Sequence, residues 1–344
     1  MNTDRYISSF TGRSNNLGLL KIIAAILVIF SHAYAVTGTS DDPLYRLTGS
    51  QLSFGGLAVA VFFFASGFFI AKSLLKRRSG LEFWKGRLIR IYPAFITVIL
   101  LTAFVLGPVL TTLPAGEYFR NTQTYSYLLY LLMIPRYYLP GVLDNAPYPG
   151  VINGSLWTLI LEMICYAGIF IVFILHLLER EKLKKLNLIL IPAALILLIV
   201  QPPQIYSFHG YYRPLLIFIT GAEFCVFADR IPLNWKYFAV TALAGIVCCM
   251  LRRFDLFMVF GFPYLLSCAV FSPMQLSNSL GSLGDYSYSL YLVGFPFQQT
   301  VEYCFPGSGI WVNTFVSLAV SAVAAVLLYR YVEKPSVRYF TKKK

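Results

Sequence analysis

The chain has 344 residues, of which 58% are hydrophobic and 12% are charged, and its mean hydropathy is +0.67. Soluble domains carry about 25% charged residues, so this composition excludes an ordinary soluble protein and indicates a protein that crosses a membrane several times. The net charge of +13 does not indicate a nucleic-acid partner, because the basic residues form short clusters between apolar runs. No polar stretch is long enough for a second, soluble domain, so we expect one membrane domain over residues 1–344.

Ten apolar runs are long enough, or nearly so, to cross a hydrocarbon core of about 30 Å. They lie at about 17–36, 56–75, 88–110, 155–178, 187–201, 211–228, 236–251, 255–272, 286–304 and 310–332. The sequence therefore predicts an all-α, polytopic helical bundle. A further apolar stretch, 125–134, is short and ends at Pro135. We expect it to form a partial or surface helix within a long outer loop, about 109–154.

The positions of the basic clusters orient these spans. With ten spans, the connections on one side carry Lys76-Arg77-Arg78, the cluster within 180–185 and the tail 342–344. The opposite connections are poorer in Lys and Arg, with Arg252-Arg253 as the exception. Because basic loops stay in the cytoplasm, we predict that both termini are cytoplasmic. Counting 125–134 as a span would place the later basic clusters outside.

The six cysteines carry no metal signal. They lie within or at the end of apolar runs, and no CxxC or Cys/His ligand spacing is present. We interpret them as small apolar residues and expect no metal site. The N-terminus lacks the features of a signal peptide, so we expect the first apolar run to be a retained span.

The first apolar run carries two ionisable residues, Lys21 and His32. Their separation of eleven residues is about three helical turns, so both side chains share one face of the helix. An ionisable residue inside a span is costly and marks a candidate functional site. Lys21 would lie roughly 6 Å from the inner face, and His32 roughly 22 Å from it, in the outer third of the membrane.

Two other spans carry charges at matching depths. Arg87 and Arg90 open the third apolar run and face one way, near the inner face. Glu162 lies roughly 10 Å from the outer face, at the depth of His32. The sequence thus predicts an inner cationic layer and an outer His–Glu layer. The cations would also suit anchors that extend to the membrane surface, whereas a buried His and Glu must pair or face a cavity.

Small and aromatic residues have structural explanations. Gly55-Gly56 and Ala65-Ser66-Gly67 would let two helices approach closely, and simple packing explains them at least in part. The 24 tyrosines fit belts at the membrane interfaces, and some could stack on a sugar. The belt is the interpretation that we adopt for most of them.

Five segments, taken in order, resemble bacterial membrane acyltransferases of acyltransferase family 3 over nearly the whole chain. They are the first helix, with a cation eleven residues before His32; Gly55-Gly56 with Val61-Phe62-Phe63-Phe64-Ala65-Ser66-Gly67-Phe68; Arg87-Leu88-Ile89-Arg90-Ile91-Tyr92-Pro93 with its R-x-x-R; Gly154-Ser155-Leu156-Trp157-Thr158-Leu159 with Glu162; and Ser287-Tyr288-Ser289-Leu290-Tyr291-Leu292, followed by Glu333-Lys334-Pro335.

The resemblance implies an essential histidine at His32, contacts to acyl-CoA at Arg87 and Arg90, and a functional acid at Glu162. The family usually has arginine where this chain has Lys21, and the substitution keeps a cation suited to phosphate but loses the planar fork. Members of the family transfer an acyl group, usually acetyl, from cytoplasmic acyl-CoA to a hydroxyl of a surface or exported glycan.

Gly294 stands where relatives often have histidine, which argues against a second catalytic histidine there. Some members of the family carry an additional soluble esterase-like domain, which we do not expect in this chain.

We therefore predict an O-acetyltransferase of the bacterial inner membrane, with acetyl-CoA as donor and a glycan or lipid-linked saccharide, such as lipopolysaccharide or exopolysaccharide, as acceptor. His32 would act as general base, with Glu162 orienting it or stabilising its charged form, and Lys21, Arg87 and Arg90 would hold the phosphates. Direct transfer and an acyl-histidine intermediate are both compatible with the sequence. The alternative is a transporter or flippase for a lipid-linked glycan or small anion, which would use the same buried charges as a path.

Overall fold

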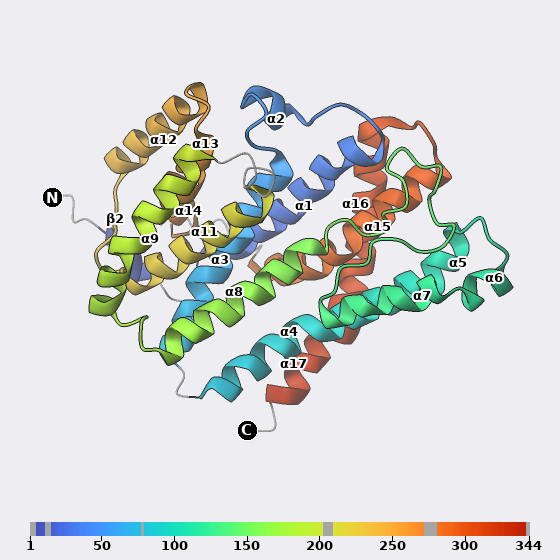
Figure 1. The fold of residues 1–344 in the computed structure, drawn as a ribbon, viewed down its shortest axis with the longest axis horizontal. Coiled ribbons are helices and arrows are strands. Elements are labelled where there is room, and N and C mark those ends of the chain that lie inside the picture. Colours follow the sequence, from blue (N-terminus) through green and yellow to red (C-terminus); the bar gives the residue numbers. More distant parts are fainter. Residues whose placement is uncertain (1–4, 11–14, 77–78, 202–208, 272–280, 342–344) are drawn as a thin grey trace. The chain divides into compact units, whose positions relative to one another are not determined.

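A computed structural model describes residues 5–10, 15–76, 79–201, 209–271 and 281–341. These ranges are mainly helical, as the sequence predicts (Figure 1). The strands described within them are β1 (Arg5–Tyr6) and β2 (Pro232–Leu233), which pair antiparallel over two residues each. Two groups of basic residues used to orient the spans, 77–78 and 342–344, lie outside the described residues.

A helix occurs at each of the ten predicted spans. The longer helices are α1 (Leu17–Val36), α3 (Phe54–Lys76), α4 (Gly80–Leu101), α8 (Trp157–Ile174), α9 (Arg180–Val200), α11 (His209–Val226), α12 (Trp235–Met250), α15 (Ser287–Cys304) and α16 (Gly309–Leu328). The shorter ones are α2 (Pro43–Leu47), α5 (Gly107–Leu110), α6 (Ala115–Arg120), α7 (Thr122–Ser126), α13 (Phe254–Leu256), α14 (Phe262–Val270) and α17 (Lys334–Thr341).

Six helical stretches of the described chain are long and apolar enough to cross a membrane. They are Leu17–Val36, Phe54–Lys76, Gly80–Leu110, Trp157–Ile174, Arg180–Val200 and Gly309–Phe340. Two of them continue through π-helical turns, Thr102–Leu106 and Tyr329–Glu333. The chain is therefore a multi-pass helical membrane protein. Ten spans and cytoplasmic termini stay predictions.

The chain forms two compact units that are interleaved in sequence. The first unit comprises residues 1–24, 43–80 and 161–284, and the second comprises residues 25–42, 81–160 and 285–344. Helices α1 and α8 each contribute residues to both units.

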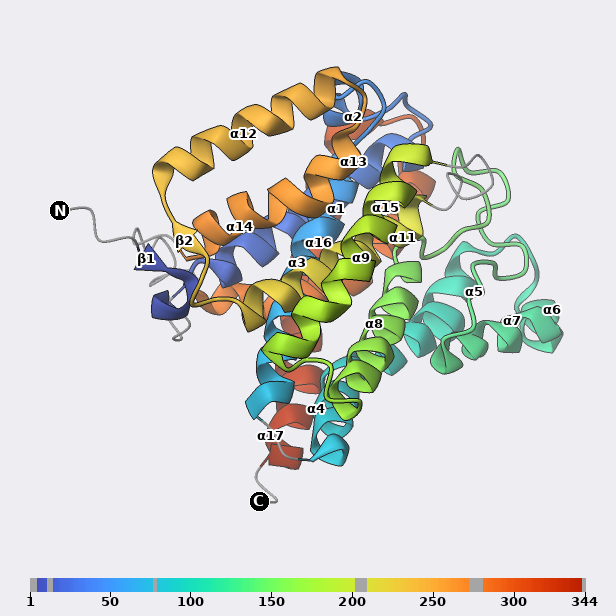
Figure 2. The same ribbon diagram turned by 60° about the vertical axis from the view of Figure 1, so that its left-hand side comes forward.

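Helices α3 and α11 pack backbone to backbone in the first unit (Figure 1). A Cβ atom added to Gly67 would overlap the carbonyl oxygen of Phe218, and one added to Gly221 would overlap the carbonyl oxygen of Phe64. The expectation that Gly67 serves helix packing is therefore confirmed. In the same unit α12 lies alongside α14 (Figure 2).

The long loop predicted at 109–154 is part of the core of the second unit. Tyr118, Tyr127 and Tyr130 are among its largest fully buried side chains and pack against α4 and α15. For these three tyrosines the interpretation as an interfacial belt is therefore wrong. The Tyr118 hydroxyl donates to the carbonyl oxygen of Ala103 at 2.7 Å, and burial raises the pKa of the Tyr118 phenol to about 12. The stretch expected to be a partial helix contains a short 3-10 helix, Tyr127–Leu132.

Candidate functional site

The predicted site residues divide between the two units. Lys21 and Glu162 belong to the first unit, whereas His32, Arg87 and Arg90 belong to the second. Helix α1 is continuous over Lys21 and His32, as predicted. Two pairs were predicted to lie together, Lys21 with Arg90 and His32 with Glu162. In each pair, one residue belongs to the first unit and the other to the second. Both pairings stay predictions.

His32 lies on the second half of α1 and contacts an aromatic ring of α15. Its imidazole meets the ring of Phe295 edge to face, with 5.1 Å between the ring centroids and 78° between the planes. Its Nδ1 atom is buried and has no hydrogen-bond partner among the described residues. Most buried polar atoms of proteins do have a partner. Nδ1 is therefore a candidate to contact a group outside the described residues, such as a bound substrate.

The ring of Phe295 is held from its other sides by the segment before α8. The ring lies so close to Gly154 that a Cβ atom there would be 2.8 Å from it. The ring of Tyr148 also meets Phe295, with 5.9 Å between centroids. Glycine at position 154 is thus required by the aromatic contact, which explains why Gly154 opens the fourth of the five segments.

Side-chain hydrogen bonds fasten this segment to α15. They are Asn153 Nδ2 to Leu292 O (3.0 Å), Tyr291 OH to Ser155 O (2.7 Å), and Gln299 Nε2 to both Tyr148 O (2.9 Å) and Val151 O (2.8 Å). The fourth and fifth of the segments therefore pack together within one unit. The sequence showed both motifs but not that they meet.

Helix α15 is also fastened to α1, one turn before His32. Gln298 Nε2 donates to the carbonyl oxygen of Ile29 at 2.6 Å. A Cβ atom on Gly294 would lie 3.0 Å from the side chain of Ile29. Glycine at position 294 therefore allows α15 to approach the helix that carries His32, and this is its role here.

Arg87 and Arg90 lie one turn apart on α4, with Arg87 half-buried and Arg90 exposed. Arg90 interacts electrostatically with Glu333, which is buried and accepts a hydrogen bond from Ser289 Oγ at 2.9 Å. The R-x-x-R segment and both parts of the fifth segment thus meet. The sequence analysis recognised Glu333 as part of a motif and gave it no role.

Glu162 has its partners within the first unit. Its Oε1 atom accepts a hydrogen bond from Ser66 Oγ at 3.0 Å and a short one from the hydroxyl of Tyr166. Ser66 Oγ lies 3.2 Å from the same hydroxyl. The sequence analysis missed both residues. Tyr166 follows Glu162 by four residues, a helical contact spacing, and Ser66 lies in a stretch that was interpreted as packing.

Lys21 is half-buried, just over one turn into α1. The start of this helix is fixed in the first unit, because the backbone N–H of Asn16 donates to the carbonyl oxygen of Val270 at 2.9 Å. The side chain of Asn15 accepts a hydrogen bond from the N–H of Leu17 at 3.1 Å. These contacts fix the start of α1, and with it the position of Lys21, within the first unit.

The first unit also contains a buried ion pair that the sequence analysis missed. Arg213 Nη1 lies 2.8 Å from Asp255 Oδ1 and donates to the carbonyl oxygen of Gln51 at 3.1 Å. Both charged side chains are nearly fully buried. The paired charges join α11 to α13. Among the described residues, no group of three or more His, Cys, Asp and Glu side chains could hold a metal ion.

Comparison of the sequence with known proteins identifies related proteins and a family. An "O-acetyl transferase" of Shigella phage Sf6 is 29% identical over 330 residues, which cover 92% of each chain. "Nodulation protein 10" of Rhizobium leguminosarum bv. viciae is 29% identical over 227 residues, which cover 63% of this chain and 59% of that protein. No solved structure matches the chain. The model of acyltransferase family 3, described as an acyltransferase domain, matches residues 14–330. The chain therefore belongs to acyltransferase family 3 and is an acyltransferase.

Proposed function

We propose that this protein is an O-acetyltransferase of the bacterial inner membrane that transfers acetyl from cytoplasmic acetyl-CoA to a hydroxyl of an exported glycan or lipid-linked saccharide. The observation that carries the proposal is the buried Nδ1 atom of His32, which has no hydrogen-bond partner in the part of the chain that the structure describes. The imidazole contacts Phe295, whose ring packs against Gly154 of the fourth segment. The printed name of the phage relative supports acetyl as the group and oxygen as the acceptor atom.

In the proposed reaction His32 is the general base. Imidazole has an ordinary pKa of about 6.5, so it can take and return a proton near neutral pH. The acceptor oxygen attacks the thioester carbonyl while the imidazole takes its proton. A C–O bond forms, the C–S bond breaks, and the proton passes from the imidazole to the departing thiolate of CoA.

Glu162 is proposed to orient His32 or to stabilise its charged form, as the acid does in a hydrolytic triad. Hydroxyls of Ser66 and Tyr166 both bond to Oε1 of Glu162, so they fix the direction of the carboxylate. A carboxylate held in this way keeps its direction while it acts on the base.

Lys21, Arg87 and Arg90 are proposed to bind the phosphates of acetyl-CoA at the cytoplasmic side. Charge-assisted hydrogen bonds to phosphate are about twice as strong as neutral ones. Arginine offers a bidentate fork, whereas Lys21 offers a point charge. The donor would then reach along α1 from Lys21 towards His32.

The test is label transfer in membranes supplied with radiolabelled acetyl-CoA and the glycan of the host. We expect His32→Ala to reduce label in the glycan to background while the variant still inserts and folds. The matched control is His176→Ala, because His176 is exposed on the turn after α8, and it should keep normal activity. Near-normal transfer by His32→Ala would overturn the mechanism.

The same experiment addresses the two possibilities that the sequence left open. Rapid denaturation at neutral pH before the acceptor is added, followed at once by removal of free acetyl-CoA, retains label on the protein if an acyl-histidine forms. It leaves the protein unlabelled if transfer is direct. Movement of a glycan across the membrane without any transfer of label would instead support a transporter.

A further inference from the structure

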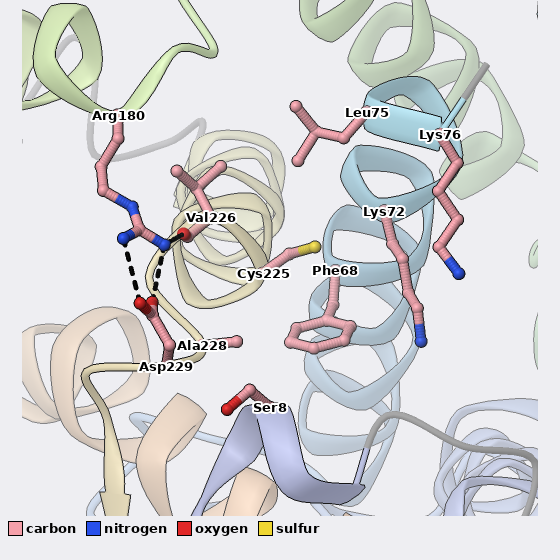
Figure 3. A pocket seen from close by; sticks show the side chains of 10 residues that line it. All are labelled: Ser8, Phe68, Lys72, Leu75, Lys76, Arg180, Cys225, Val226, Ala228 and Asp229. Atoms are coloured by element: carbon pink, nitrogen blue, oxygen red, sulfur yellow. Dashed lines mark hydrogen bonds and ion pairs between the residues drawn. The ribbon is translucent and has the colours of Figure 1, made fainter.

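The first unit contains a second basic site, apart from the residues of the proposed reaction. A pocket of about 410 Å³ opens at the C-terminal end of α3, beside the start of α9 and the end of α11 (Figure 3). Three cations line it, Lys72, Lys76 and Arg180, and among its lining residues Asp229 is the single acid. Among the described lining residues, the positive charges therefore exceed the negative ones by two.

Arg180 and Asp229 form one wall of the pocket and largely satisfy each other. Arg180 donates to both carboxylate oxygens of Asp229, at 2.7 and 3.0 Å, and to the carbonyl oxygen of Val226 at 3.1 Å. The hydrogen bond from Arg180 lowers the pKa of Asp229 below its usual range, so this acid stays charged at neutral pH. The wall is a fixed ion pair that ties α9 to the chain after α11.

The excess charge comes from Lys72 and Lys76, four residues apart on α3. Their side chains extend in the same direction from the helix (Figure 3). Like charges at this spacing repel each other, and an anion bound between them would relieve the repulsion. Lys72 is half-buried and Lys76 is exposed, so the pair reaches from the wall of the pocket to its mouth.

The remaining walls are apolar. They include Phe68 and Leu75 on α3 and Val226 on α11. A purely hydrophilic anion would use only the cations, whereas a ligand with an apolar part beside its phosphate would use both surfaces. Basic pockets between helices at the cytoplasmic surface of a membrane commonly bind lipid head groups.

We propose that this pocket binds a phosphate group, with Lys72 and Lys76 as its cationic ligands. The phosphate has two possible sources, the head group of an anionic phospholipid or the phosphates of CoA. In the predicted topology the end of α3 faces the cytoplasm, where both occur. None of the residues assigned to the proposed reaction lines the pocket, so binding of a lipid here is independent of that reaction, whereas binding of CoA rests on it.

The test measures ligand binding to the purified full chain in neutral detergent. Dimyristoylphosphatidylglycerol and CoA are titrated separately, with dimyristoylglycerol as the phosphate-free probe, and binding is followed by native mass spectrometry. Each basic residue near a membrane surface contributes roughly a fivefold factor in affinity. Lys72→Gln with Lys76→Gln should therefore weaken binding of one phosphate probe roughly 25-fold, and added salt should weaken binding to the wild-type chain.

The matched control removes the same charge from Lys182 and Lys185, which are exposed on α9 and do not line the pocket. This double Gln variant should bind within about twofold of wild type, and arginine at positions 72 and 76 should preserve binding. If the double Gln variant of the pocket is misfolded, Lys76→Gln alone should weaken binding roughly fivefold.

A selective loss with phosphatidylglycerol would assign the phosphate to a lipid, and a selective loss with CoA would assign it to the acyl donor. Equal weakening by the pocket and control variants, or binding of neither phosphate probe, would overturn the proposal. The acetyl-transfer assay compares wild type with His32→Ala, a position that does not line the pocket, so failure of one proposal does not decide the other.

Discussion

Two helix pairs of this protein are held together by opposite means. In the first unit α3 and α11 meet through glycines, with Gly67 and Gly221 each against a carbonyl oxygen of the other helix. In the second unit α15 and α16 meet through amides. Asn313 Nδ2 donates to the carbonyl oxygen of Gln298 at 3.0 Å, and Gln298 Nε2 lies 3.3 Å from Asn313 Oδ1. All of these contacts are buried.

The difference shows which part of each unit is adaptable. Backbones in direct contact leave no space to repack, so the glycine contact fixes the position of α3 and with it Ser66. The amide contact belongs to a longer buried polar row along α15 and α16. Several of its oxygen atoms have no partner among the described residues: Gln298 Oε1, Gln299 Oε1, Glu302 Oε2, Ser317 Oγ and Ser321 Oγ. Because buried polar groups are normally bonded to protein or water, we expect this row to be hydrated.

The largest expected effect is loss of the glycine contact. Gly67→Ala would place a methyl group against the backbone of Phe218, and the helices would have to separate. Overpacking costs about 1–3 kcal/mol, and contact with backbone places this case at the upper end. Thermal unfolding in detergent should show a clear loss of stability.

The control for this prediction is Gly168→Ala, on α8. A Cβ atom there meets nothing within 4 Å, and alanine suits a helix better than glycine. Its stability should be unchanged or slightly higher. Equal behaviour of the two alanine variants would show that α3 and α11 are not packed as tightly as their glycines indicate.

The second prediction compares two polar residues of this row, one hydrogen-bonded within the protein and one without a partner among the described residues. Asn313→Ala removes both hydrogen bonds to Gln298, whereas Gln298 Nε2 keeps its bond to the carbonyl oxygen of Ile29. Each lost bond contributes about 0.5–1.5 kcal/mol. Ser321→Ala removes a hydroxyl that has no partner in the described chain, so its stability should change by less than about 0.5 kcal/mol. The measurement is again thermal unfolding. A loss with Ser321→Ala as large as that with Asn313→Ala would contradict this prediction.

The sequence predicted close packing at Gly67 without its partner helix and missed the amide contact, for a physical reason. Small residues such as Gly67 reveal that something approaches closely, although they do not say which helix. Polar residues such as Gln298 and Asn313 reveal nothing alone, because a polar residue in an apolar run is informative only when its partner is known. Gln298 and Asn313 are bonded to each other but lie fifteen residues apart in the chain, on either side of a turn.

The same limit applies to the site. Depth along each span could be derived from topology, and it selected His32 and Glu162 because charge in hydrocarbon is costly. Contacts through neutral residues could not be derived. The hydroxyl of Ser66 on Glu162 and the ring of Phe295 on His32 follow from how helices rotate against one another, which hydrophobic periodicity does not determine.

The smallest structural effect is expected at Ser66, next to the glycine that sets its position. Ser66→Ala removes one hydrogen bond to Glu162, which contributes about 1 kcal/mol, and the neighbouring contact of Gly67 is untouched. If the carboxylate orients the base, kcat for acetyl transfer should fall about fivefold while KM for acetyl-CoA is unchanged, since the lost interaction acts after the donor has bound.

Ser73→Ala, two turns further along α3, is the matched control and should keep wild-type kcat. Ser66→Ala with wild-type kcat and lowered stability would show that this hydroxyl only holds α3 against α8. In that case Ser66, like Gly67 beside it, would serve packing, and the direction of the Glu162 carboxylate would rest on Tyr166.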